Sequence, residues 1–117
     1  MMINNRNIYG LTERDMKTIQ DIFKRYSEIT QVRLFGSRAK GNYKQGSDID
    51  LAVMDTGVSS KVMSDIAFEF EESSLPYMVD LISYPTLKHE ELIEHIDRVG
   101  IVFYETLEKY QVKDVIT

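Results

Sequence analysis

The sequence predicts an α+β fold, close to the α/β class, in which helices flank a small mixed β-sheet. Segments whose apolar residues recur at helical spacing are interspersed with short segments of strand-like alternation. The 117 residues suffice for one compact core and not for two. A composition of 43% hydrophobic and 28% charged residues is ordinary for a globular protein. We therefore expect a single domain over residues 1–117.

The first half of the chain is expected to form a helix followed by two strands. Residues 11–26 are predicted as the helix, because one of its faces collects the apolar residues Met16, Ile19, Ile22, Phe23 and Tyr26. Thr12 and Asp15 have the spacing of a capping box at its start. Residues 30–35 alternate as a strand that ends at Gly36, and residues 48–54 are predicted as the second strand.

The second half repeats the alternation of helix and strand. Helical spacing of apolar residues predicts helices over residues 60–72 and 87–98. Residues 77–83 are predicted as a third strand, and residues 101–105 as a short strand or helix. We interpret the last residues, from about 109 to 117, as a loose tail or a docked segment.

Composition also excludes several classes of protein. With 19 acidic and 14 basic side chains the net charge is −5, so we expect no direct nucleic-acid substrate held through many phosphate contacts. The absence of cysteine excludes a disulfide framework and favours a reducing compartment. No apolar run approaches the roughly 20 residues that cross a bilayer, and the N-terminus lacks the apolar core of a secretory signal. We therefore expect a cytoplasmic protein that does not associate with membranes.

Two short patterns are weaker than they look. Gly36 and Gly41 have the spacing of a P-loop, but Asn42 follows where that motif requires lysine. His89 and His95 are six residues apart and therefore lie on different faces of a helix, which excludes a zinc pair. We interpret both histidines as surface or partly packed residues.

Three aspartates form the pattern that indicates chemistry. Side chains two residues apart on a strand share one face, so Asp48 and Asp50 point the same way. Ile49, Leu51 and Val53 point to the opposite face, toward the core. Asp80 lies between aliphatic residues of the next predicted strand and stands beside the pair if those strands are neighbours. Clustered carboxylates repel unless a cation lies among them. Hard oxygen ligands suit Mg²⁺ or Mn²⁺, and two such ions can support an in-line phosphoryl displacement.

A glycine-rich loop precedes these acids and carries positive charge. Gly36 lets the backbone approach a ligand, and Ser37 is expected to open a short helix toward Lys40 whose N–H groups and hydroxyl face an anion. Residues 38–44 contain Arg38, Lys40 and Lys44 and no acid. Phosphates and metal ions would therefore find both halves of a site in this part of the chain.

The residues GSRAKGNYKQGSDIDLAV resemble a known family. Gly-Ser, ten intervening residues and Asp-x-Asp are similar to the signature of the DNA polymerase β-like nucleotidyltransferase superfamily, and the whole run most resembles its minimal nucleotidyltransferases. The resemblance implies that Asp48 and Asp50 hold two catalytic Mg²⁺ ions. It implies that Asp80 is the third ligand and a candidate base. It further implies that Gly36 and Ser37, with Arg38 and Lys40 beside them, bind the phosphates of a nucleoside triphosphate.

The resemblance also suggests an acceptor. Minimal nucleotidyltransferases resemble antitoxins paired with a HEPN-domain ribonuclease toxin, which implies transfer of AMP from ATP to a tyrosine of that toxin. An acidic stretch, residues 62–87, contains five acids and no Lys or Arg, and it is a candidate docking flank for a basic partner.

Two alternatives stay open on the sequence alone. One is transfer to a small hydroxylated molecule, as in aminoglycoside-modifying relatives, with a second domain or a second copy of the chain completing the site. The other is a non-catalytic antitoxin that neutralises its toxin by binding.

Overall fold

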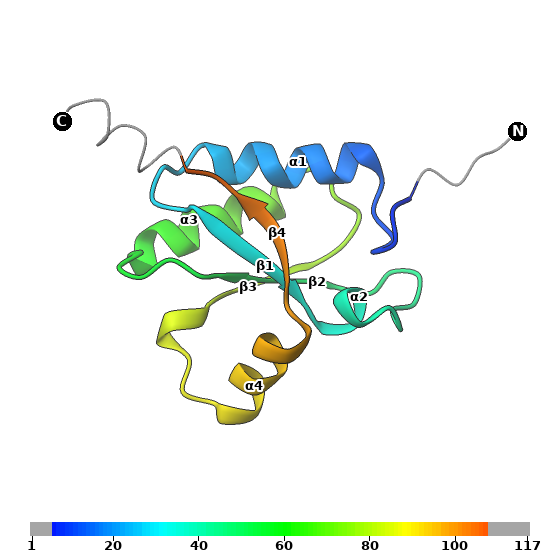
Figure 1. Cartoon of the computed structure of the whole chain (residues 1–117). Coiled ribbons are helices and arrows are strands. Elements are labelled where there is room, and N and C mark those ends of the chain that lie inside the picture. Colours follow the sequence, from blue (N-terminus) through cyan, green and yellow to red (C-terminus); the bar gives the residue numbers. More distant parts are fainter. Residues whose placement is uncertain (1–5, 108–117) are drawn as a thin grey trace, which may run out of the picture.

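A computed structural model describes residues 6–107 and shows four helices and one 3₁₀ turn around a single sheet (Figure 1). Along the chain the elements are α1 (Glu13–Lys24), β1 (Gln31–Phe35), α2 (Gly36–Lys40), β2 (Ile49–Val53), α3 (Ser60–Glu71), β3 (Val79–Ser83), η1 (Tyr84–Thr86), α4 (Glu90–Val99) and β4 (Ile101–Glu105). Within the described residues no helix is long and apolar enough to span a bilayer.

The sheet is mixed, as the sequence predicts. Its strand order is β3-β2-β1-β4. β1 is antiparallel to both β2 and β4, whereas β2 and β3 are parallel. A parallel pair requires a crossover, and α3 provides it. The pairing with β1 shows that residues 101–105 form a strand and not a helix.

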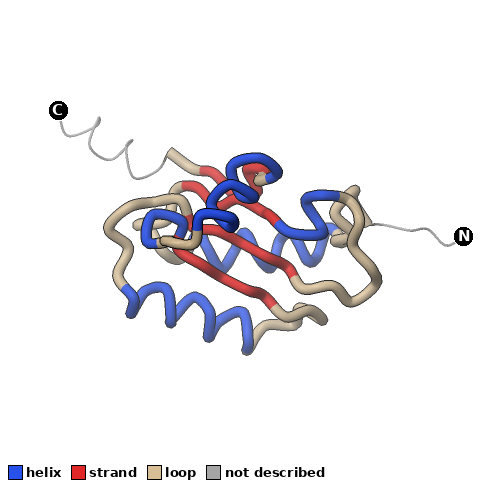
Figure 2. The backbone as a smooth tube through the Cα atoms, turned by 90° about the horizontal axis from the view of Figure 1, so that it is seen from below, coloured by secondary structure: helices blue, strands red, loops and turns tan. Residues whose placement is uncertain are grey.

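Helices cover the two faces of the sheet unequally. Figure 2 shows α4 in front of the strands and α1 behind them. The α1 and α3 side holds the larger core, in which the ring of Phe23 lies 5.4 Å from that of Phe70 and 5.5 Å from that of Tyr104. The α4 side holds a small cluster centred on Phe35, Ala52 and Ile96. Less apolar surface is buried on this second side, which also carries the acids described below.

The helix ends follow local sequence signals. Thr12 and Asp15 form the predicted capping box: each backbone N–H donates to the side chain of the other residue, both at 3.0 Å. The predicted short helix from Ser37 to Lys40 is confirmed and begins one residue earlier, at Gly36. α4 begins three residues later than expected, because η1 precedes it and His89 caps it by accepting from the backbone N–H of Leu92. The prediction for residues 109–117 lies outside the described part of the chain.

The acidic stretch is partly paired within the protein. Glu69 accepts hydrogen bonds from Arg25 and from the hydroxyl of Tyr26, which joins α3 to α1. Asp65 forms an ion pair with Lys61 one turn away. The charge offered to a partner by this stretch is therefore smaller than the sequence indicates.

Candidate active site

Two strands bring Asp50 and Asp80 side by side. In the parallel pairing of β2 with β3 these residues are direct partners, and neighbouring strands lie roughly 4.8 Å apart. Ile49 and Leu51, which alternate with Asp50, are fully buried in the larger core. The carboxylates therefore lie on the α4 side of the sheet. Asp48 lies just before β2 and not within it, and it is exposed, as is Asp80.

The electrostatics of Asp50 show that the other two acids act on it. Burial, together with the negative charges of Asp80 and Asp48, raises the pKa of the Asp50 carboxyl to about 6. The guanidinium of Arg38 opposes this rise only in part. Asp50 is the half-buried member of the group, so its charge is the costliest to keep in the absence of a cation.

The donor set fits a hard divalent cation. Asp48 and Asp80, which raise the pKa of Asp50, supply with it oxygen ligands and excess negative charge, which Mg²⁺ and Mn²⁺ favour. Among the described residues, no three His, Asp or Glu side chains already form a complete cage. Asp48, Asp50 and Asp80 are the residues that would hold such a cation.

Gly36 lies against Asp50 and cannot be another residue without rearrangement. Its φ is +76°, and an added Cβ would stand 2.1 Å from Oδ2 of Asp50. This close approach puts the first turn of α2 directly beside the carboxylates. Ser37 follows and is partly exposed, and its carbonyl accepts from the backbone N–H groups of Gly41 and Asn42 at 2.9 and 3.2 Å. The predicted phosphate-binding pair therefore adjoins the predicted metal ligands.

Arg38 does not lie where the sequence suggests. Its side chain is 1% exposed. The guanidinium donates twice to the carbonyl of Ser47, at 3.1 and 2.7 Å, and once to the carbonyl of Tyr9, at 2.8 Å. It also lies over the ring of Tyr77, 4.4 Å from the centroid. These contacts use the nitrogens that a phosphate would need, so Arg38 braces the segment leading to Asp48.

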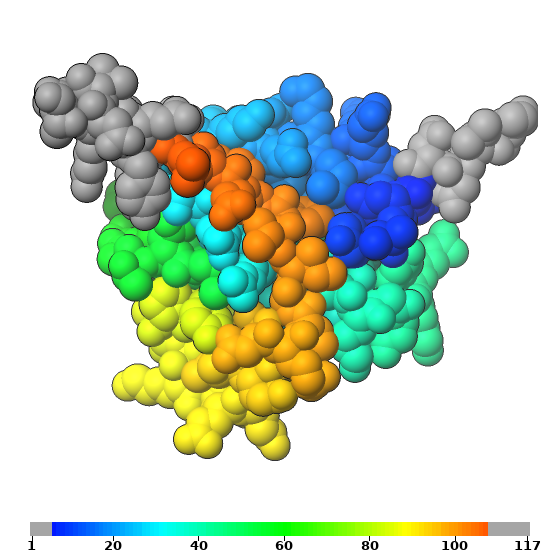
Figure 3. All heavy atoms as spheres, viewed as in Figure 1, coloured from blue at the N-terminus to red at the C-terminus, as the bar shows by residue number. Residues whose placement is uncertain are grey.

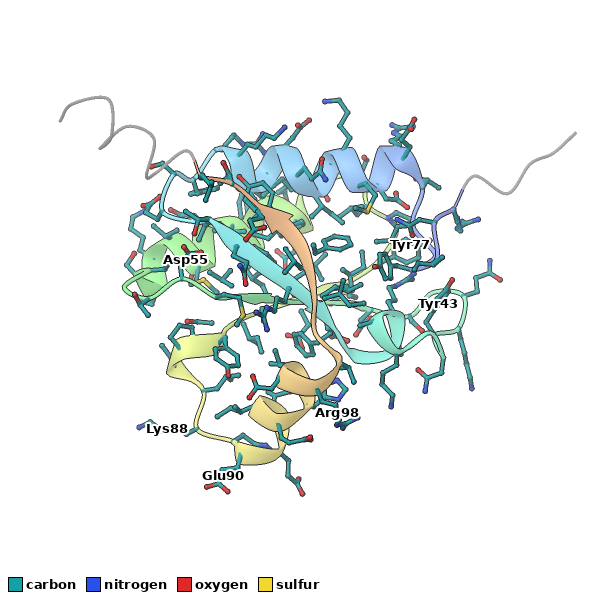
Figure 4. All side chains as sticks on the ribbon, in the orientation of Figure 1. Tyr43, Asp55, Tyr77, Lys88, Glu90 and Arg98 are labelled. Atoms are coloured by element: carbon teal, nitrogen blue, oxygen red, sulfur yellow. The ribbon has the colours of Figure 1, made fainter. Side chains whose placement is uncertain are left out.

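The expected cluster of three free cations therefore reduces to two lysines. Lys40 at the end of α2 and Lys44 in the following loop are both exposed. Figure 4 shows Tyr43 and Tyr77 near this loop, beside α2. The aromatic rings enclose Arg38, since the ring of Tyr43 also lies 5.2 Å from it. Sequence inspection missed this arrangement, because its members come from three segments without a shared local pattern.

His95 is the second residue that sequence inspection missed. Its Nε2 accepts a hydrogen bond from the backbone N–H of Gly36 at 3.1 Å, and its ring packs edge-on against Phe35. The interpretation of His95 as partly packed is correct as far as burial goes. Its partner is 59 residues away, so spacing along α4 held no signal for this contact.

Comparison with known proteins agrees with this geometry. The family described as "Polymerase beta, Nucleotidyltransferase" matches residues 17–109. A curated relative from Haemophilus influenzae, named probable protein adenylyltransferase MntA, is 33% identical over 103 residues. That match covers 85% of this chain and 90% of the relative.

Solved structures share the fold at low sequence identity. A toxin–antitoxin complex with AMP-PNP has a TM-score of 0.65 at 20% identity, covering 84% of this chain and 79% of the other. A tri-AMPylated HEPN toxin of Shewanella oneidensis in complex with its MNT antitoxin gives a TM-score of 0.54 at 20% identity, with coverages of 82% and 76%. Family match, curated relative and fold agree. The chain belongs to the polymerase beta nucleotidyltransferase family and, within it, to the minimal nucleotidyltransferases.

Proposed function

We propose that this protein is an adenylyltransferase that moves AMP from ATP to a tyrosine of a HEPN-domain toxin and so acts as its antitoxin in the cytoplasm. The observation that carries the proposal is the register of Asp50 with Asp80 beside the Gly36 turn. It occurs in a chain that is 33% identical to MntA. The similarity to MntA supports ATP as the nucleotide donor and a protein as the acceptor, and the geometry of the acids and the Gly36 turn supports phosphoryl transfer.

In the proposed reaction the acceptor hydroxyl oxygen attacks the α-phosphorus of ATP. A bond forms between that oxygen and phosphorus, the bond to the bridging oxygen breaks, and pyrophosphate leaves with the electron pair. Asp80, the exposed acid of the strand pair, is proposed to accept the hydroxyl proton. Bound Mg²⁺ would neutralise charge on the triphosphate and the leaving group. Asp48, Asp50 and Asp80 are proposed to hold it.

The remaining residues would position the nucleotide. Ser37 and the backbone beside Gly36 are proposed to bind phosphate oxygens, with exposed Lys40 supplying positive charge at the far end of α2. Arg38 is proposed to act indirectly, because its contacts with Ser47 and Tyr9 hold the loop before Asp48 in place. Such fixed placement is the main contribution a protein makes to phosphoryl transfer.

The decisive experiment is intact-mass analysis of a HEPN-domain toxin after incubation with this protein, ATP and Mg²⁺. We expect the toxin to gain the mass of at least one AMP, and Asp48→Ala with Asp50→Ala to abolish the gain. Asp21→Asn serves as a matched control, since it removes an acid outside the candidate docking flank whose ion-pair partner, Lys17, lies on the same helix.

Other outcomes would identify the alternatives. Retained modification in the double variant would contradict the assignment of the two acids. Turnover of ATP with a small hydroxylated acceptor and no toxin would indicate the small-molecule reaction. A double variant that still binds the toxin and protects cells would indicate an antitoxin that acts by binding.

A further inference from the structure

His95 is the point where α4 touches the candidate phosphate-binding turn. It lies one residue before Ile96, the buried residue of α4. Its Nε2 accepts from Gly36 N–H at 3.1 Å in a partly buried setting. A ring nitrogen that accepts is unprotonated, so this hydrogen bond requires the neutral imidazole with its hydrogen on Nδ1.

The Gly36 peptide is therefore held from two sides. On one side its Cα faces Oδ2 of Asp50 so closely that no Cβ fits between them. On the other side its N–H is engaged by His95. The preceding residue, Phe35, is the strand partner of Asp50. Its ring packs edge-on against the ring of His95, with ring centroids 6.1 Å apart. One side chain thus contacts both residues that lead from β1 into the turn.

We propose that His95 is a positioning residue for nucleotide binding: its Nε2 fixes the Phe35–Gly36 peptide plane and thereby the direction in which the chain enters the turn at Ser37, with its backbone N–H and hydroxyl. This inference rests on the proposed function, because it takes the Gly36–Ser37 turn as the phosphate site. Without the acceptor, the Gly36 N–H is partly buried without a protein partner, and the peptide is free to rotate away from the triphosphate. The contact is present before substrate binds, so it acts on ground state and transition state alike.

Such a role predicts a particular kinetic signature. Loss of an interaction shared by ground and transition states raises KM and leaves kcat nearly unchanged. We expect His95→Leu to raise KM for ATP about tenfold, the effect of one partly buried hydrogen bond. His95→Gln, whose amide oxygen can replace Nε2 as acceptor, should restore most of the affinity. A purely structural defect would lower the active fraction, and hence kcat, without this rescue.

Binding of AMP-PNP with Mg²⁺, measured by calorimetry on the protein alone, tests the inference without a toxin. Wild-type protein and His95→Gln should bind with similar affinity and His95→Leu about tenfold more weakly. His89→Asn is the matched control: it replaces the other histidine of the same helix, keeps a capping side chain at that position, and should leave affinity unchanged. Equal affinity in all variants, or equal weakening in His95→Gln and His95→Leu, would overturn the role.

The wild-type protein supplies a measurement independent of any variant. Long-range ¹H–¹⁵N spectra should show His95 with unprotonated Nε2 and protonated Nδ1, and the Gly36 amide should exchange slowly with solvent. A His95 tautomer protonated at Nε2, or a rapidly exchanging Gly36 amide, would overturn the proposal even if the protein transfers AMP. Conversely, a protein that shows both signals but modifies no toxin would contradict the proposed acceptor and leave the His95 contact intact.

Discussion

Asp50 lies half-buried beside two other carboxylates, so its charge opposes folding until a cation offsets it. Burial and the charges of Asp80 and Asp48 raise its pKa from 3.8 to about 6. Its contribution to stability is therefore fully present below about pH 4 and is lost as the pH rises through 6. At neutral pH the site stores an unfavourable interaction that metal binding can relieve.

Asp50→Asn should therefore stabilise the metal-free protein at pH 7 while abolishing AMP transfer. After allowance for solvent screening of a half-exposed group, we expect a gain of about 1–2 kcal/mol in the free energy of unfolding. The gain should become small as the pH falls toward 4, because it is lost completely only where the carboxyl is protonated in the folded and the unfolded protein alike, below its unfolded pKa of 3.8. Urea denaturation in EDTA between pH 4 and 7.5 measures it, and equal stability of both proteins at pH 7 would refute the account.

Gly36 shows how a second single residue limits the site. A side chain at this position would be strained by the positive φ, and its Cβ would lie 2.1 Å from Oδ2 of Asp50. Gly57 has nearly the same φ, +77°, but an added Cβ would meet nothing within 4 Å. A comparison of substitutions at Gly36 and Gly57 therefore distinguishes the effect of backbone strain from the effect of contact with Asp50.

Gly36→Ala and Gly57→Ala should thus differ more in the rate of AMP transfer than in their cost in backbone strain. Each is expected to cost about 1–2 kcal/mol of stability for the left-handed backbone. Gly36→Ala should also displace Asp50 and lower the rate of AMP transfer at least about 100-fold, by the sensitivity of catalysis to misplacement on the order of 1 Å. Gly57→Ala should keep near wild-type kinetics. Comparable rates for the two variants would show that the close approach is unimportant.

At the scale of elements, what the sequence could predict depended on how local the signal was. The capping box of α1, the Gly-Ser turn and the two acids around Ile49 are patterns within a few residues, and the structure contains all of them. Arg38 was expected in a positive patch for phosphates, because a cation in a glycine-rich loop resembles an anion ligand, whereas the structure buries its side chain. Its carbonyl partners belong to residues 9 and 47. Only the packed elements bring them together.

Arg38→Lys distinguishes bracing from phosphate binding. Lysine cannot reproduce the paired bonds to Ser47 or the planar stacking on Tyr77. We expect a loss of about 2–3 kcal/mol in the free energy of unfolding, since a buried hydrogen-bonded charge loses its partners. Lys44→Met, the removal of an exposed cation in the same loop, should be nearly neutral. If Arg38 instead binds phosphate, Arg38→Lys would leave urea denaturation unchanged and raise KM for ATP.

For the molecule as a whole, the unequal covering of the sheet relates stability to function. α1 and α3 share the larger core and are joined through Glu69, whereas α4 buries one residue. Figure 1 shows α4 below the sheet, and in Figure 3 the yellow-to-orange part of the chain that contains it forms the lower end of the molecule. The links of α4 to the rest include the hydrogen bond that the Gly36 N–H donates to His95 and the one that the Tyr84 hydroxyl donates to Asp97 at 2.6 Å. A site built between a firm sheet and a lightly held helix can adjust to substrate.

Hydrogen exchange should therefore rank the elements and respond to nucleotide. In the metal-free protein we expect α4 amides to exchange at least about tenfold faster than those of α1 and β1, because local opening of α4 exposes less apolar surface. AMP-PNP with Mg²⁺ should slow exchange in α4 as well as at residues 36–37, because nucleotide bound at the turn also fixes Gly36, whose backbone N–H donates to His95. In His95→Leu the slowing should persist at the turn, at saturating nucleotide, and disappear from α4. Uniform protection of α1 and α4 without nucleotide, or an α4 response that survives in His95→Leu, would show that the helix is held by its apolar contacts alone.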